Sequence, residues 1–120
     1  MLSKEGLLAA QLEKEKVEIL GNFVWVRGMT GTERDQWEQS VLYHQKKSKT
    51  ESYDQFRASL VVRTVCDESG NRLFTDDEIA KVGALPCAIV DKLYSVGARL
   101  SAVSQKDEEE LGKNSMPDQS

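Results

Sequence analysis

Hydrophobic and polar residues alternate with a period of two in a short region near the start of the chain. Residues 17–19 are Val, Glu and Ile, and a β-branched and aromatic run at residues 23–26 follows the dipeptide Gly21-Asn22. Alternation of this kind is typical of strands, and Gly and Asn both tolerate the positive φ angles of a two-residue turn. Residues 17–29 are therefore predicted to form a β-hairpin that turns at Gly21 and Asn22. A hairpin is marginal alone, so it must lie on helices or pair its edge with another chain.

Capping boxes, in which Ser or Thr is followed three residues later by Glu, predict where three helices begin. They start at Thr30, Ser48 and Thr75. The second helix is predicted to extend through residue 66, because the apolar positions from residue 56 to residue 64 continue one stripe. The β-branched residues at its end would also fit a strand by propensity.

A fourth helix is predicted after Pro86. Proline ends the preceding helix near Leu85 and can start the next one, because its missing N–H is no loss in a first turn. The apolar residues then recur at near-ideal helical spacing. They are Ile89, Leu93, Val96 and Leu100.

The two ends of the chain differ from this central region. Residues 1–16 alternate Leu and Ala with charges and are predicted to be a weak helix or an arm that orders against a partner. Residues 104–120 are polar apart from Leu111 and Met116 and are predicted to be a flexible tail. Residues 17–103 are then one small α+β domain, with a β-hairpin packed on about four helices.

Charge and composition exclude several classes of function. The 120 residues are 39% hydrophobic and carry a net charge of -4, which fits one soluble domain and argues against a general nucleic-acid binder. The basic residues that cluster are Arg34, Lys46, Lys47, Lys49, Arg57 and Arg63. Acidic residues interleave them, so a solvated helix face is expected. No apolar stretch reaches the ~18 residues of a membrane helix, so no membrane partner is expected.

One acidic segment has the ligand spacing of a calcium loop. With Asp67 at the first loop position, side-chain or backbone oxygens fall at every ligand position through Glu78. Arg72, however, stands where this loop needs glycine, so a turn followed by a capped helix is expected instead.

The sequence predicts no enzyme and no cofactor. Cys66 and Cys87 are expected to be buried structural thiols, and His44 to face solvent or lie at a helix end. These residues suggest no combination of a nucleophile with an activating base.

In order and spacing, three segments resemble the tail assembly chaperones of lambda-like long-tailed bacteriophages (siphoviruses) and prophages. The first is the strand-to-helix segment FVWVRGMTGTERD at residues 23–35. The second is DESGNRLFTDDE at residues 67–78, and the third is Leu85-Pro86 with the helix that ends in GARLS at residues 97–101. The polar segment at residues 108–114 adds to the likeness.

The resemblance implies a function without catalysis. Such proteins act in the host cytoplasm, self-associate into rings or spirals, bind the tape measure protein and keep it soluble while the tail tube polymerises around it. They are absent from the mature virion. A longer form, made by ribosomal frameshifting, carries an added domain that recruits the tail tube protein.

A surface around the hairpin and the last helix is expected to make the contacts between copies. Aromatic residues dominate binding hot spots, although the core is the expected place of at least two of the three near the hairpin. The residues proposed for this surface are Phe23, Trp25, Arg27, Trp37, Leu93 and Leu100. The alternative function is a small cytoplasmic adaptor or regulatory module that binds another protein. A calcium-binding module at residues 67–78 is the weaker alternative.

Overall fold

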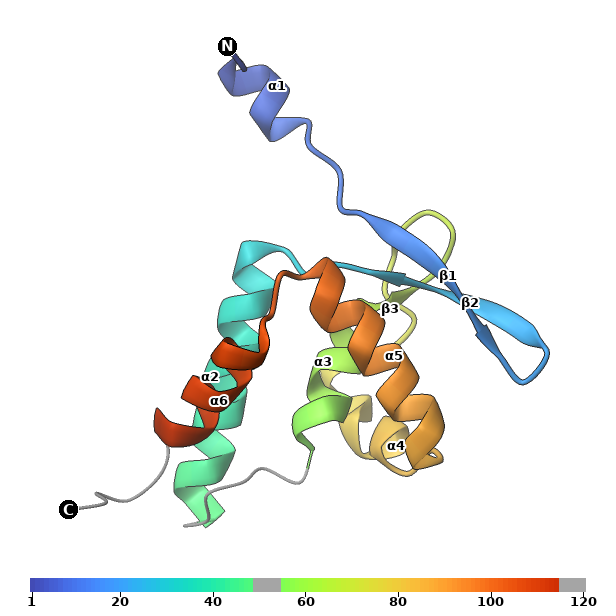
Figure 1. Cartoon of the computed structure of the whole chain (residues 1–120), viewed down its shortest axis with the longest axis vertical. Coiled ribbons are helices and arrows are strands. Elements are labelled where there is room, and N and C mark those ends of the chain that lie inside the picture. The colour runs from blue at the N-terminus through green and yellow to red at the C-terminus, as the bar shows by residue number, and fades with distance from the viewer. Residues whose placement is uncertain (49–54, 115–120) are drawn as a thin grey trace.

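The computed structural model describes residues 1–48 and 55–114. It is an α+β domain in which a three-stranded antiparallel sheet lies at one end of a group of helices (Figure 1). In chain order the elements are α1 (Lys4–Leu8), β1 (Lys14–Ile19), β2 (Asn22–Arg27), α2 (Gly31–Ser48), α3 (Phe56–Thr64), β3 (Val65–Cys66), the 3₁₀ helix η1 (Asp76–Glu78), α4 (Ile79–Gly83), α5 (Cys87–Leu100) and α6 (Gln105–Asn114). The predicted fold class is confirmed.

The hairpin is present, but its turn lies one residue earlier than predicted. Leu20 and Gly21 form the turn with φ angles of 54° and 75°, and Ile19 pairs with Asn22. The predicted turn at Gly21 and Asn22 would have paired Ile19 with Val24. Both registers keep the same residues on the inner face, so the alternation of the sequence cannot choose between them.

A third strand replaces the predicted end of the second helix. That helix, α3, ends at Thr64, and Val65 and Cys66 pair with Val26 and Trp25 of β2. The β-branched propensity of this segment is realised because β2 offers it an edge. The predicted start of this helix at Ser48 rests on residues 49–54, which lie outside the described residues.

Two predicted capping boxes are confirmed. The Glu33 amide donates to the Thr30 hydroxyl at 3.1 Å, and the Thr30 amide donates to the Glu33 carboxylate at 2.9 Å. Thr75 and Glu78 make the same reciprocal arrangement at the start of η1. Each box satisfies amide groups that the first turn of a helix leaves unpaired.

The core is built around α3, which is buried from residue 58 to residue 64. The last predicted helix, α5, packs along it and also lies under the inner face of the sheet. The contact with α3 is close at Gly97, where a Cβ atom would come within 2.7 Å of the Thr64 hydroxyl and 3.0 Å of Leu60. Glycine inside this helix is therefore explained by close packing of the two helices.

The prediction of a flexible tail is wrong for residues 105–114, which form α6. Ser104 begins this helix by exchanging hydrogen bonds with Asp107, and Leu111 is 5% exposed within the core. The Tyr94 hydroxyl donates to the Glu108 carboxylate, and burial raises the pKa of Tyr94 so that it stays a donor. One leucine and these polar contacts hold the helix on the domain, which the polar composition did not indicate.

The turn at Leu20 yields a stability prediction. A left-handed φ costs a β-carbon-bearing residue about 1 kcal/mol or more, and Asn tolerates it better than Leu. Replacing Leu20 with Asn is therefore expected to raise the free energy of unfolding by about 1 kcal/mol in urea denaturation of dilute protein. Leu8→Asn, on the exposed arm, is the matched control and should change nothing. Equal stability of Leu20→Asn and the wild type would contradict the strain at this turn.

Candidate functional site

The outer face of the hairpin carries aromatic and basic side chains away from the core. In the register of β1 and β2, Lys16 lies opposite Trp25 and Glu18 lies opposite Phe23. Because side chains alternate along a strand, these four residues share the face that α5 does not cover. Phe23 is 49% exposed, which is high for a ring of this size. This exposed face is the candidate functional surface.

Two lysines lie over the rings of this face. Phe23 and Trp25 meet edge to face, with ring centroids 6.4 Å apart. The Lys16 ammonium lies 4.6 Å from the Phe23 centroid and 5.5 Å from that of Trp25, and Lys14 lies 5.1 Å from Trp25. We call Lys14, Lys16, Phe23 and Trp25 the lysine–aromatic face. It combines apolar area with positive charge, and it suits a partner that offers apolar groups beside carboxylates.

The hairpin also presents a backbone edge. The Gly28 amide donates to the Glu13 carbonyl at 3.1 Å, so the odd-numbered residues of β1 direct their backbone groups towards β2. The even-numbered residues, Lys14, Lys16 and Glu18, therefore direct theirs outward. Within residues 1–48 and 55–114, no strand lies along this side of β1.

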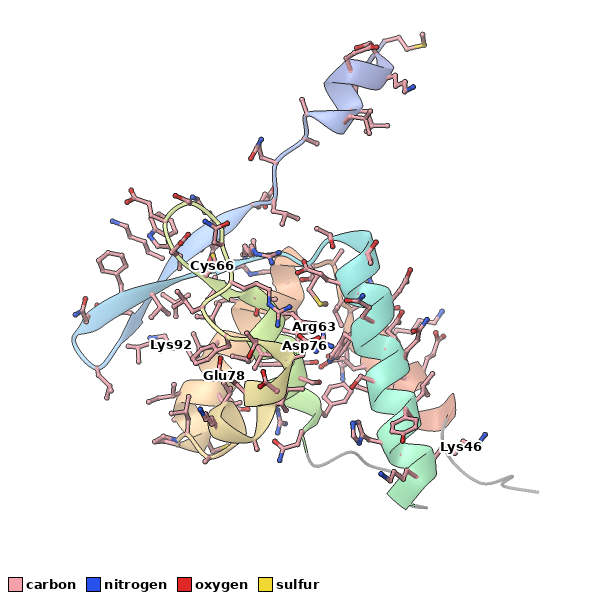
Figure 2. The ribbon with its side chains drawn as sticks, turned by 180° about the vertical axis from the view of Figure 1, so that it is seen from behind. Lys46, Arg63, Cys66, Asp76, Glu78 and Lys92 are labelled. Atoms are coloured by element: carbon pink, nitrogen blue, oxygen red, sulfur yellow. The ribbon has the colours of Figure 1, made fainter. Side chains whose placement is uncertain are left out.

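One side chain partly covers this edge. The Lys92 ammonium, on α5, donates to the Glu18 carbonyl at 2.7 Å. Lysines are a common way to protect a strand edge from pairing, and this contact occupies one of the outward carbonyls. Figure 2 labels Lys92 on α5.

Exposed apolar residues concentrate at the N-terminal arm and the hairpin turn. The arm carries α1, which has no buried residue, and Figure 1 shows it extending away from the domain. Leu7 and Leu8 of the arm are 62% and 74% exposed, and Leu20 of the turn is 88% exposed. Apolar exposure grouped in this way marks surfaces that meet a partner.

Two of the six residues predicted for the interface lie together on the lysine–aromatic face, namely Phe23 and Trp25. The prediction is wrong for Trp37 and Leu93, which are 1% and 5% exposed and belong to the core. Trp37 packs edge to face on Phe56 with centroids 5.3 Å apart. Leu100 is half-buried, and its carbonyl closes on Gly28.

Arg27, the sixth predicted interface residue, is a buried structural cation. Its guanidinium donates to both oxygens of Glu33 at 2.8 and 2.9 Å and to the Gly28 carbonyl at 2.9 Å. Burial alone would raise the pKa of Glu33, but hydrogen bonds from Arg27 and from the Thr30 amide hold it below the ordinary value of 4.5. The pair fastens the end of β2 to the first turn of α2. The spacing of six residues between its members carries no signal in the sequence.

The acidic segment at residues 67–78 uses its carboxylates on its own backbone. Asp67 accepts hydrogen bonds from the Ser69 and Asn71 amides, both at 2.9 Å, which lowers its pKa. Glu78 caps Thr75, and Arg72 binds Asp76 at 2.7 Å. In the described part of the chain, no group of three or more His, Cys, Asp or Glu residues is placed to hold a metal ion. This geometry favours a capped turn over a calcium loop.

The two cysteines differ in their surroundings. Cys66 is buried in β3, and its burial raises the pKa of the thiol. Cys87 is exposed at the start of α5, so the prediction that both thiols are buried is wrong for Cys87. Among the helices that the structure describes, none is long and apolar enough to span a membrane.

The Arg27–Glu33 pair generates a pH prediction. The lowered pKa of Glu33 adds stability above its unfolded value, and this stability is lost as the pH falls through the folded value. We expect Glu33→Gln to lower the free energy of unfolding at pH 7 by about 2 kcal/mol, measured by urea denaturation. On acidification below pH 5, the free energy of unfolding of this variant should fall less than that of the wild type. Glu38→Gln, on the same helix, is the control. An unchanged acid slope in Glu33→Gln would contradict this role.

No protein-family model, curated protein or solved structure matches this chain. The likeness to tail assembly chaperones therefore rests on the order and spacing of the segments at residues 23–35, 67–78 and 85–101. Those segments and the surface of the hairpin are the features that bear on the function of the protein.

Proposed function

We propose that this chain is a non-catalytic tail assembly chaperone of a long-tailed bacteriophage or prophage. It self-associates, binds the tape measure protein, keeps that protein soluble and promotes polymerisation of the tail tube. It works in the host cytoplasm and is not part of the mature virion. The observation that carries the proposal is the combination, on one hairpin, of an exposed aromatic face and a strand edge that pairs with no strand of the described residues.

The lysine–aromatic face has the chemistry that a long, largely helical client requires. Phe23 and Trp25 offer apolar area to the hydrophobic stripe of a helix, while Lys14 and Lys16 offer charge to the acidic residues beside that stripe. Each such contact is modest, because exposed cation–π and ion-pair contacts contribute about 1 kcal/mol or less. Many copies along one client would add these contacts through avidity, which suits a chaperone that coats its client and later leaves it.

The resemblance also supplies the remaining partners of this proposal. A longer form of the chain, made by frameshifting, would carry an added domain that recruits the tail tube protein. In such a form, α6 would stand between the hairpin-bearing domain and the addition. Contacts of α6 with α2 hold this helix on the domain that would carry the addition.

Solubility of tape measure fragments tests the proposal. Each fragment from the same genome is co-expressed with the wild type, Phe23→Ser or Tyr43→Ser. The wild type is expected to keep at least one otherwise insoluble fragment in solution, and Phe23→Ser should lose most of this effect with an unchanged thermal midpoint. Tyr43 is 60% exposed on α2, outside the proposed surface, so its variant is the matched control.

Two results would overturn parts of this proposal separately. A folded Phe23→Ser variant that protects the fragment as well as the wild type would remove the lysine–aromatic face from client binding. A wild type that protects no fragment and binds none would remove the chaperone function and favour the adaptor alternative.

A further inference from the structure

The outward edge of β1 has a self-complementary charge pattern. Lys14, Lys16 and Glu18 carry the outward backbone groups, and their side chains all lie on the outer face. The inner face holds Val17 and Ile19, which α5 covers. A second strand added here must keep its own inner residues on the covered side, so even-numbered residues must pair with even-numbered ones.

Charge selects one antiparallel register among those that join β1 to a second copy of itself. A two-fold axis at Lys16 pairs Lys14 with Glu18 but puts the two Lys16 side chains opposite each other. An axis at Val17 pairs Lys16 with Glu18 of the second copy twice and leaves no like charges opposite. Opposite charges stabilise cross-strand pairs, and like charges destabilise them. The Val17 register also packs the two valines against each other on the inner face.

We propose that β1 pairs antiparallel with β1 of a second copy about an axis at Val17. The two three-stranded sheets then form one continuous sheet. Each Lys16–Glu18 pair exchanges both of its N–H···O bonds, which satisfies the outward backbone groups of these two residues. This inference deepens the self-association in the proposed function and rests on that part of it.

The pairing joins the two lysine–aromatic faces. Within one hairpin, Lys16 lies opposite Trp25 and Glu18 lies opposite Phe23. Across the paired β1 strands, one row of side chains forms on the outer face. It runs from Trp25 and Lys16 of one copy to Glu18 and Phe23 of the second copy. Lys16 already lies over both rings of its own copy, so the carboxylate of the second copy meets a lysine that is held in place.

The same register places each N-terminal arm beside a hairpin turn. Lys14 of one copy falls opposite Leu20 of the second copy, so the residues before Lys14 run past that turn. The arm brings exposed leucines to this place, and Leu20 is itself 88% exposed. The proposal therefore gives both groups of exposed apolar side chains a neighbour.

Lys92 has to give way for this contact to form. Its ammonium holds the Glu18 carbonyl, which in the pair accepts from the Lys16 amide of the second copy. The lysine protects the edge of a single copy and competes with pairing. Replacing Lys92 with Met keeps the aliphatic chain and removes the donor, so the pair should become several-fold tighter.

Charge exchange tests the register. Lys16→Glu and Glu18→Lys should each weaken self-association about tenfold, measured by sedimentation equilibrium, because each puts like charges opposite. An equimolar mixture of the two variants should restore it, and so should the double variant Lys16→Glu/Glu18→Lys. An axis at Lys16 predicts no recovery in the double variant, because Lys14 would then face the lysine introduced at position 18 and the like charges at position 16 would remain. Lys106→Glu and Glu109→Lys, both exposed on α6, are the matched controls.

The outcomes separate this inference from the proposed function. Wild-type oligomers that ignore the charge changes at Lys16 and Glu18, or that weaken in Lys92→Met, would overturn the pairing of β1 and leave self-association standing. A wild type that stays monomeric at every concentration would overturn the pairing and self-association together. Client binding is measured independently, by the solubility of the tape measure fragments.

Discussion

The junction between the sheet and the helices depends on one buried ion pair. Arg27 ends β2, Glu33 lies in the first turn of α2, and their bidentate contact sets the direction in which the chain leaves the sheet. The glycine between them, Gly28, lets the end of α5 approach until a Cβ atom would stand 2.6 Å from the Leu100 carbonyl. A bond from the Met29 amide to the Ser101 hydroxyl at 2.8 Å closes the same corner. The end of β2, the start of α2 and the end of α5 are therefore held together at this corner.

This corner explains why the hairpin can serve as a surface while the rest of the molecule serves as its support. The inner valines of β1 and β2 rest on α5, and α5 rests on α3 through Gly97. Among the described residues, no helix or strand covers the outer face, and lysines of the neighbouring strand lie over its rings. The turn after β3 reaches one end of this face, where the Lys14 ammonium donates to the Glu68 carbonyl. Apolar area that a larger protein would bury stays accessible at one end of this small domain.

Local features of this fold can be predicted from the sequence, and features set by packing cannot. The capping boxes at Thr30 and Thr75 and the helix α5 depend on residues within a few positions of each other, and their prediction is confirmed. Of the predicted stripe of α5, only Leu93 is fully buried, because the helix turns Val90, Tyr94 and Gly97 towards the core as well. The turn at Leu20 is not predicted, because the observed and the expected registers of the hairpin bury the same side chains. The strand β3 is not predicted because it forms only where the free edge of β2 lies beside it. The helix α6 is not predicted because it is held by Leu111 and by contacts of Asp107 and Glu108 with Arg34 and Tyr94, which are distant in the sequence.

The candidate site follows the same division. Alternation predicts that Phe23 and Trp25 share a face, but apolar residues also occupy the other face of β2, so the pattern does not tell which face is covered. Arg27 and Trp37 are of residue types that are common in interfaces. Both are buried here, because Arg27 pairs with the Glu33 carboxylate and Trp37 packs on the ring of Phe56. Which charged and aromatic side chains stay exposed is decided by the packing of the whole domain, and not by the residues next to them in the sequence.

An edge that is complementary to itself has a consequence for how the protein would assemble. A two-fold contact uses the same surface on both copies and closes once two copies have met. If β1 is used in this way, any ring or spiral would grow by the addition of pairs and would contain an even number of chains. The contact that links one pair to the next would then have to lie outside the edge of β1.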